Sequence, residues 1–342
     1  MRKSLLGNAA LVILGLFLAL LPLTGYQEGI VVLLCINCVA AMGVSLLTGF
    51  TGIFTLGHAA YMALGAYTAA IMTARWGVHW LPSIVAGGVV AVAVAWLIGM
   101  PTLRLTGDYY AIASIGLGEA IRLILENWQS FTRGARGFPG IASYASRGVA
   151  AALFTVLGIA MFNLIGSRLG RELKASRDDP AAASLMGFNT TASRMKALLI
   201  SAFYCGISGA LLAGYMTFIQ PSMFDMMKST ELTAVVVFGG LGSMSGTLLG
   251  AAIITLAMEL FRNASGIVPY IPSFISPKWT GVLVDFLTNL SQYRMLLYGL
   301  LLVGVMVLLP EGMQGLWSFA RKIFSWFFPD TGRPDPEKEG LR

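Results

Sequence analysis

Residues 29–48 read GIVVLLCINCVAAMGVSLLT and contain no charged side chain. As an α-helix, a run of this length crosses the roughly 30 Å hydrocarbon core of a lipid bilayer. Comparable apolar runs recur along the chain, at residues 8–24, 57–74, 81–100, 149–166, 197–218 and 292–309. We therefore predict an all-α fold, a polytopic bundle of transmembrane helices.

The composition of the whole chain points the same way. Of its 342 residues, 56% are hydrophobic and 11% are charged, whereas a soluble domain carries about 25% charged residues. The net charge of +7 does not indicate nucleic-acid binding, because the basic residues gather at the ends of the apolar runs. Cys35, Cys38 and Cys205 all lie within such runs, which argues against a disulfide framework and against a redox-active Cys-x-x-Cys site.

Residues 108–127 are helical in pattern but less apolar, and they contain Glu119, Arg122 and Glu126. At spacings of three and four, these side chains share one face of a helix and can pair with one another. We predict a membrane span that lines a polar interior. Ionisable residues inside a membrane are functional candidates, although ion pairing that lets the helix pack in the bundle explains the same pattern.

Residues 231–262 are apolar but are interrupted by a cluster of glycines, Gly239, Gly240, Gly242 and Gly246. We predict two shorter helical pieces joined at a glycine turn. With these two weaker regions, the bundle is expected to hold about eight to ten spans, some of them broken at glycines.

The distribution of Lys and Arg predicts the orientation of the chain. Arg2 and Lys3 precede the first run, and Arg321 and Lys322 lie near the end, so both termini are expected in the cytoplasm. The tail 329–342 is short, charged and rich in proline, and we expect it to be disordered.

The longest polar loop between clear spans covers residues 167–196 and is basic, so we place it in the cytoplasm as well. Counting spans then puts residues 127–148 outside, although this loop carries Arg133, Arg136 and Arg147. Residues 170–189 of the cytoplasmic loop read GRELKASRDDPAAASLMGFN, which predicts two short helices. Pro180 suits the first turn of the second helix, Asp178 or Asp179 its N-cap, and Gly187 its end. Such a helix can dock on a cytoplasmic partner, and its Ala182 and Ala183 face must then stay small, because a bulky side chain such as tryptophan at Ala183 would hold the two surfaces apart. A solvated connector is the alternative.

This loop is similar to the coupling segment of ABC importer permeases, in which a Glu-Ala-Ala triplet is followed three residues later by glycine. Here Ala181-Ala182-Ala183 precede Gly187, and the initial Glu is absent. The sequence more specifically resembles the LivM-type family of branched-chain amino acid permease subunits, which has a similar Gly-Arg…Arg-Asp-Asp…Ala-Ala…Met-Gly loop. Residues 48–67 (TGFTGIFTLGHAAYMALGAY) and 239–251 (GGLGSMSGTLLGA) carry the same resemblance.

The resemblance covers about residues 30–312, and we predict a permease domain over residues 1–328, in a bacterial inner membrane. It implies a pore shared with a second, similar permease subunit, two cytoplasmic ATPase subunits that bind ATP, and an extracytoplasmic solute-binding protein. The solute would be a branched-chain amino acid or a related small solute such as urea. The residues that it assigns to the coupling loop are Arg171, Arg177, Asp178, Asp179, Ala182, Ala183 and Gly187.

The two glycine-rich stretches lie in the two halves of the chain, a pattern typical of a translocation pathway built from broken helices. Close helix packing by small residues is the alternative for each single glycine. The residues predicted for the pathway are Gly49, Gly52, Gly57, His58, Gly239, Gly240, Gly242 and Gly246.

Other functions find less support in the sequence. The chain contains no Gly-Lys dipeptide and so lacks a phosphate-binding P-loop. We expect no enzymatic activity and no bound cofactor. We also expect no metal site, since His58 and His79 are isolated. An ion-gradient-driven transporter that uses Glu119 or Glu259 is the alternative function. Residues 132–141 resemble a glycine-rich outer loop of the same family, with Arg136 where members often have an acidic residue.

Overall fold

The computed structural model describes residues 2–20, 25–105 and 107–262, together with the isolated positions Leu296, Gly299, Leu300 and Val303. The predicted span at 292–309 falls almost wholly outside the described residues, as do Arg321, Lys322 and the tail 329–342.

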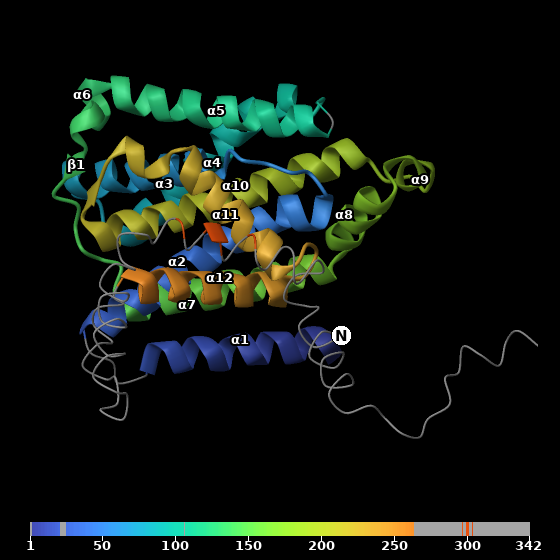
Figure 1. Cartoon of the computed structure of the whole chain (residues 1–342), viewed down its shortest axis with the longest axis horizontal. Helices are drawn as coiled ribbons and strands as arrows, with labels where there is room; N and C mark the ends of the chain where they lie inside the picture. Colours follow the sequence, from blue (N-terminus) through green and yellow to red (C-terminus); the bar gives the residue numbers. More distant parts are fainter. Residues whose placement is uncertain are drawn as a thin grey trace, which may run out of the picture.

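The described part of the chain contains nine helices of 13 or more residues. They lie side by side in one bundle (Figure 1). They are α1 (Arg2–Leu20), α2 (Gly25–Val44), α3 (His58–Ala70), α4 (Trp80–Thr102), α5 (Asp108–Asn127), α7 (Arg147–Gly166), α10 (Thr190–Met216), α11 (Met226–Gly239) and α12 (Met244–Arg262).

Short elements connect these helices. Two π-helical turns, η1 (Ser45–Gly49) and η2 (Ile71–Arg75), extend α2 and α3. The remaining short helices are α6 (Gln129–Thr132), η3 (Gly134–Arg136), α8 (Arg168–Asp178), α9 (Pro180–Leu185) and η4 (Pro221–Phe224). Strands β1 (Phe138–Pro139) and β2 (Phe218–Ile219) pair antiparallel, with Phe138 opposite Ile219.

The helical membrane bundle predicted from the sequence is confirmed. Four helices of the described chain are long and apolar enough to cross a bilayer: Gly25–Gly49, Trp80–Thr102, Arg147–Gly166 and Thr190–Met216. The apolar helices Leu11–Leu20 and Met244–Leu260 are shorter. The count of about eight to ten spans therefore stays a prediction.

The core of the bundle is organised around α10, which packs against α2, α3 and α4. Glycines let these helices approach closely: a Cβ at Gly65 on α3 would overlap the carbonyl oxygen of Gly206 on α10. One at Gly209 would likewise overlap the carbonyl oxygen of Met62. Such packing is typical of membrane proteins, because small side chains bring two helix backbones into contact.

Residues 52–57, between η1 and α3, leave the helical conformation, and hydroxyl groups from other helices hydrogen-bond the better-buried part of this stretch. Ser114 Oγ of α5 accepts from the backbone N–H of Leu56 at 3.0 Å. Thr233 Oγ1 of α11 donates to the carbonyl oxygen of Thr55 at 2.9 Å. An unwound backbone is tolerated at membrane depth when protein groups satisfy it in this way.

A second break separates α11 from α12, as predicted from the glycine cluster. Gly240 and Gly242 have φ angles of +99° and +86°, a region that glycine adopts at little cost. The chain therefore reverses between Gly239 and Met244 and forms the two shorter helical pieces that the sequence indicates.

Candidate functional site

The predicted coupling loop forms a compact segment outside the bundle, which we call the coupling segment (residues 167–189). It consists of α8 and α9, and it lies at the same end of the bundle as the start of α1 (Figure 1). The elements α6 and β1 lie at the opposite end (Figure 1). The loop 127–148 and the coupling segment are thus on opposite ends, as the span count requires.

Helix α9 begins and ends with the local chemistry that its sequence predicts. Asp179 Oδ1 accepts hydrogen bonds from the backbone N–H groups of Ala181 and Ala182 at 2.8 and 3.0 Å, with Pro180 in the first turn. Of the two candidate caps, Asp179 is therefore the one used. Gly187 has a φ of +83° and ends the helix.

The C-terminal end of α9 is closed by two backbone bonds. The N–H of Gly187 donates to the carbonyl oxygen of Ser184 at 3.0 Å, and that of Phe188 to Ala183 at 3.1 Å. This pair of bonds is the Schellman arrangement, which depends on a left-handed residue after the helix. The segment is therefore a defined structure rather than a loose connector.

The two alanines expected to share a docking face point in different directions. Ala183 is 4% exposed, whereas Ala182 is exposed. Successive helical residues are about 100° apart around the axis, so one of an adjacent pair packs inward when the other faces solvent. The outward face instead carries Leu185, 88% exposed, and Met186, 78% exposed, which share a face with Ala182 at spacings of three and four.

Helix α8 is held to the bundle by its buried side and by one carboxylate. Leu173 is fully buried. Glu172 accepts from Ser193 Oγ at 2.9 Å and from Arg168 Nε at 3.0 Å. The Ser193 hydroxyl and the Arg168 guanidinium hold the pKa of Glu172 below its usual range, so this carboxylate is ionised at neutral pH and ties α8 to the start of α10.

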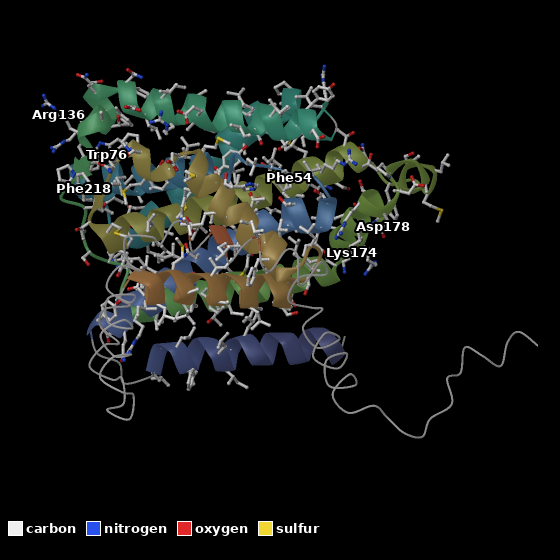
Figure 2. All side chains as sticks on the ribbon, in the orientation of Figure 1. Phe54, Trp76, Arg136, Lys174, Asp178 and Phe218 are labelled. Carbon is white, nitrogen blue, oxygen red and sulfur yellow. The ribbon has the colours of Figure 1, made fainter. Side chains whose placement is uncertain are left out.

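Two arginines of α8 that the sequence assigned to coupling make different contacts. Arg171 Nη1 donates locally, to the carbonyl oxygen of Gly166 at 3.3 Å. Arg177 Nη1 donates to the carbonyl oxygen of Gly49 at 2.5 Å, a residue 128 positions away in the sequence. Asp178 is exposed, and with Lys174 it lies at the coupling end of the molecule (Figure 2).

The side chain of Arg177 lies where Gly52 and Gly242 carry no side chain, and we call Arg177, Gly49, Gly52 and Gly242 the arginine–glycine junction. A Cβ at Gly242 would overlap Arg177 Nη1, and one at Gly52 would lie 3.1 Å from Arg177 Cγ. A Cβ at Gly49 would lie 3.1 Å from the backbone nitrogen of Gly242. The junction brings together the coupling segment and both glycine-rich stretches.

The other residues predicted for the translocation pathway are tightly packed. A Cβ at Gly57 would lie 2.5 Å from the carbonyl oxygen of Ser114, and Gly239 and Gly246 approach each other closely where α11 meets α12. His58 is fully buried, and its Nε2 lies 2.6 Å from Ser201 Oγ. Close packing accounts for these positions, and their role in translocation stays a prediction.

The charged residues of α5 pair as their spacing predicts. Arg122 Nη1 lies 2.6 Å from Glu126 Oε2, and Arg122 Nη2 lies 2.5 Å from Glu119 Oε1. The side chains of Glu119 and Glu126 are 40% and 35% exposed, and α5 lies at one edge of the bundle (Figure 1). Glu259, the other acid considered for an ion-driven mechanism, accepts a hydrogen bond from the Tyr26 hydroxyl.

A polar hollow of about 720 Å³ is lined by residues of α6, η3 and β1, at the end opposite the coupling segment. Its lining residues include Glu126, Arg133 and Arg136. The guanidinium of Arg133 lies 5.4 Å from the centre of the Phe138 ring, while Arg136 is exposed at the tip of this end (Figure 2). The resulting surface is basic and polar.

Comparisons with known proteins agree with the resemblance to LivM-type permease subunits. The sequence profile of the family described as "Branched-chain amino acid transport system / permease component" matches residues 26–306. The high-affinity branched-chain amino acid transport system permease protein LivM of Escherichia coli is 28% identical, over 83% of this chain and 69% of its own. The LivM protein of Salmonella typhimurium is also 28% identical, over 81% and 67% of the two chains.

A second permease protein of the same named system in Escherichia coli, LivH, is 27% identical over 64% of this chain and 80% of its own. No solved structure matches the chain significantly.

Proposed function

Because the chain belongs to the family of branched-chain amino acid transport permease components, we propose that it carries branched-chain amino acids, or a related small solute, across the bacterial inner membrane. It is a membrane-spanning permease subunit of an ABC importer, which the family match favours over an ion-gradient-driven transporter. The observation that carries the proposal is the arginine–glycine junction, in which the coupling segment contacts both glycine-rich stretches of the bundle.

Two cytoplasmic ATPase subunits are proposed to bind ATP and to supply the energy. The outward face of α9 suits this contact, because Leu185 and Met186 expose apolar side chains on a segment that lies outside the bundle. Exposed apolar side chains of this kind mark protein interaction surfaces. The coupling segment and the start of α1 would then face the cytoplasm, and the loop 127–148 would face outward.

The extracytoplasmic solute-binding protein is proposed to dock at the opposite end. The hollow lined by Arg133 and Arg136 offers a basic surface there. Such a surface favours a partner with acidic residues at the contact, since complementary charges steer association. This role would account for arginines in an outer loop, where the positive-inside rule disfavours them.

The second permease subunit is proposed to pack against α5. The exposed face of α4 carries large apolar residues such as Val89 and Leu97, as expected of a face in contact with lipid. The exposed side of α5 also carries large apolar residues, Ile112 and Ile124 among them, but between these it has the small residues Gly116 and Ala120, with Glu119 beside them. Ionisable groups are costly against lipid, whereas small residues suit a close contact between helices.

We expect Ala120→Trp to reduce co-purification of the second permease subunit about fivefold or more, since overpacking a close contact costs about 1–3 kcal/mol. Ala93→Trp is the matched control, because Ala93 is an exposed alanine on the apolar face of α4. Both variants should reach the membrane in normal amounts. If the Ala120 variant retains its partner while the Ala93 variant loses it, α5 is not the contact.

Uptake of labelled leucine tests the transport function directly. The permease subunits and ATPase subunits are reconstituted in vesicles with ATP inside, and the binding protein is added outside. Uptake should require ATP, survive an ionophore, and be competed by isoleucine and valine more strongly than by urea. Uptake that needs no ATP and collapses with the ionophore would contradict the proposal.

A further inference from the structure

Energy from ATP hydrolysis must pass from the surface of α9 to helices inside the bundle. Helix α8 ends at Asp178 and α9 begins at Pro180, so a single residue, Asp179, separates them. Asp179 also caps α9 through its side chain. A displacement of α9 by a bound ATPase is therefore passed directly to the end of α8, where Arg177 lies.

We infer that Arg177 is the positioning residue that transmits movement of the coupling segment to the two broken helices. The inference rests on the proposed function and identifies the connection that this function requires. Arg177 reaches the Gly49 carbonyl oxygen at 2.5 Å, while the absence of side chains at Gly52 and Gly242 makes room for its stem and its guanidinium.

The Gly49 carbonyl is well placed to receive such a signal. It lies at the end of η1, the π-helical turn that closes α2. The last carbonyls of a helix lack partners within the helix and carry partial negative charge, so a guanidinium is a favourable donor to them. Single π-helical turns also occur often at functional sites, where the regular hydrogen bonding of a helix is interrupted.

The α11–α12 turn is connected to the same guanidinium by close approach. Gly242 has a φ of +86°, and its Cα hydrogen takes the place of a side chain that would overlap Arg177 Nη1. A shift of α8 must either carry the Gly49 carbonyl with it or break the bond and move the guanidinium away from Gly242. Either event changes the junction between the two halves of the chain.

A second side chain of α8 contacts the same region. Lys174 Nζ lies 5.6 Å from the centre of the Phe50 ring, next to Gly49. Lys174 and Arg177 are three residues apart and so share one face of α8. This face of α8 is therefore directed at Gly49 and Phe50, just before the unwound chain that leads to α3. Arg177 makes the hydrogen bond of this contact.

The test compares Arg177→Met with Arg168→Met in the full complex of permease subunits, ATPase subunits and binding protein. Both changes remove a guanidinium from α8, but Arg168 is paired only with Glu172 of the same helix among the contacts described. The amount of leucine transported per ATP hydrolysed should fall at least about tenfold for Arg177→Met, as expected for loss of a charge-assisted hydrogen bond. It should change less than about twofold for Arg168→Met.

Two further variants separate transmission from a merely structural role. Arg177→Lys should restore part of the coupling ratio, because an ammonium can still donate to the Gly49 carbonyl oxygen. Gly242→Ala should lower the ratio through two effects, the strain of an alanine at positive φ and the overlap with Arg177, and only the strain should remain in the Arg177→Met background.

An Arg177→Met complex that assembles and transports with the normal ratio would overturn the inference. So would full additivity of Arg177→Met and Gly242→Ala, because independent effects would mean that the two residues do not act through one junction. If Arg177→Met fails to assemble, the same comparison is made with Arg177→Lys and Gly242→Ala. Full additivity of these two changes in the coupling ratio would then overturn the inference. Wild-type complex that shows no ATP-dependent uptake would instead refute the proposed function.

Discussion

Replacing Leu185 and Met186 together by aspartate is expected to abolish solute uptake while the chain remains folded in the membrane. These side chains are the most exposed apolar groups of the coupling segment, and apolar anchors at the centre of an interface carry most of its binding energy. Two buried, unpaired carboxylates would cost more than about 3 kcal/mol at a docked surface. Uptake and ATP hydrolysis stimulated by the binding protein should therefore both fall by more than about a hundredfold.

Thr191→Asp provides the control for this experiment. Thr191 is exposed in the first turn of α10, where an added carboxylate is favourable. This variant should transport normally. Co-purification of the ATPase subunits measures the contact itself, and a Leu185/Met186 double variant that still binds them and transports would show that α9 docks through another face.

The burial of Ala183 changes what a bulky residue would do at this position. From the sequence alone, Ala183→Trp would hold the permease and the ATPase apart. In the structure Ala183 packs inward at 4% exposure, so a tryptophan there would deform α9 before any partner binds. Leu185 and Met186 therefore test docking more cleanly, since their removal leaves no cavity inside the chain.

The local parts of the candidate site could be predicted from the sequence because their causes are local. A proline in the first turn, an aspartate one residue earlier and a glycine after the helix define α9 through bonds that span a few residues. The ion pairs of α5 follow from spacings of three and four on one helix. The break between α11 and α12 follows from glycines that adopt positive φ.

The contacts between distant segments could not be predicted in this way. Arg177 and Gly49 are 128 residues apart, and neither carries a local pattern that names the other. The same holds for the Ser114 and Thr233 hydroxyls that satisfy the unwound backbone before α3. A hydroxyl in an apolar helix commonly bonds its own backbone, so its sequence does not reveal that it serves another helix.

A glycine within an apolar run can serve two purposes, making room for a side chain or allowing two backbones to pack closely. Gly52 and Gly242 make room for Arg177, whereas Gly49, Gly57 and Gly239 let two backbones approach closely. Both uses place a glycine in an apolar run, and the sequence does not separate them. The difference lies in the neighbour: a mobile side chain in the first case and a fixed backbone in the second.

Gly65→Val is expected to prevent the chain from folding in the membrane. A Cβ at this position would overlap the carbonyl oxygen of Gly206, and α3 and α10 would have to separate along their length. Backbone atoms cannot move aside as a flexible side chain can, so the cost should exceed about 3 kcal/mol, the upper end of ordinary overpacking. The measurement is the amount of folded protein extracted in mild detergent and its midpoint of thermal unfolding.

Gly148→Val serves as the matched control, because a Cβ at Gly148 meets no atom within 4 Å among the described residues. It should change the stability by less than about 1 kcal/mol, because helix propensity slightly favours valine over glycine and no atom of the described residues stands in the way of the new side chain. Gly209→Val, which would overlap the carbonyl oxygen of Met62 on the same pair of helices, should fail as Gly65→Val does. If both variants fold and unfold at the wild-type temperature, α3 and α10 do not pack as closely as their glycines allow, and the arrangement of the bundle around α10 would have to be revised.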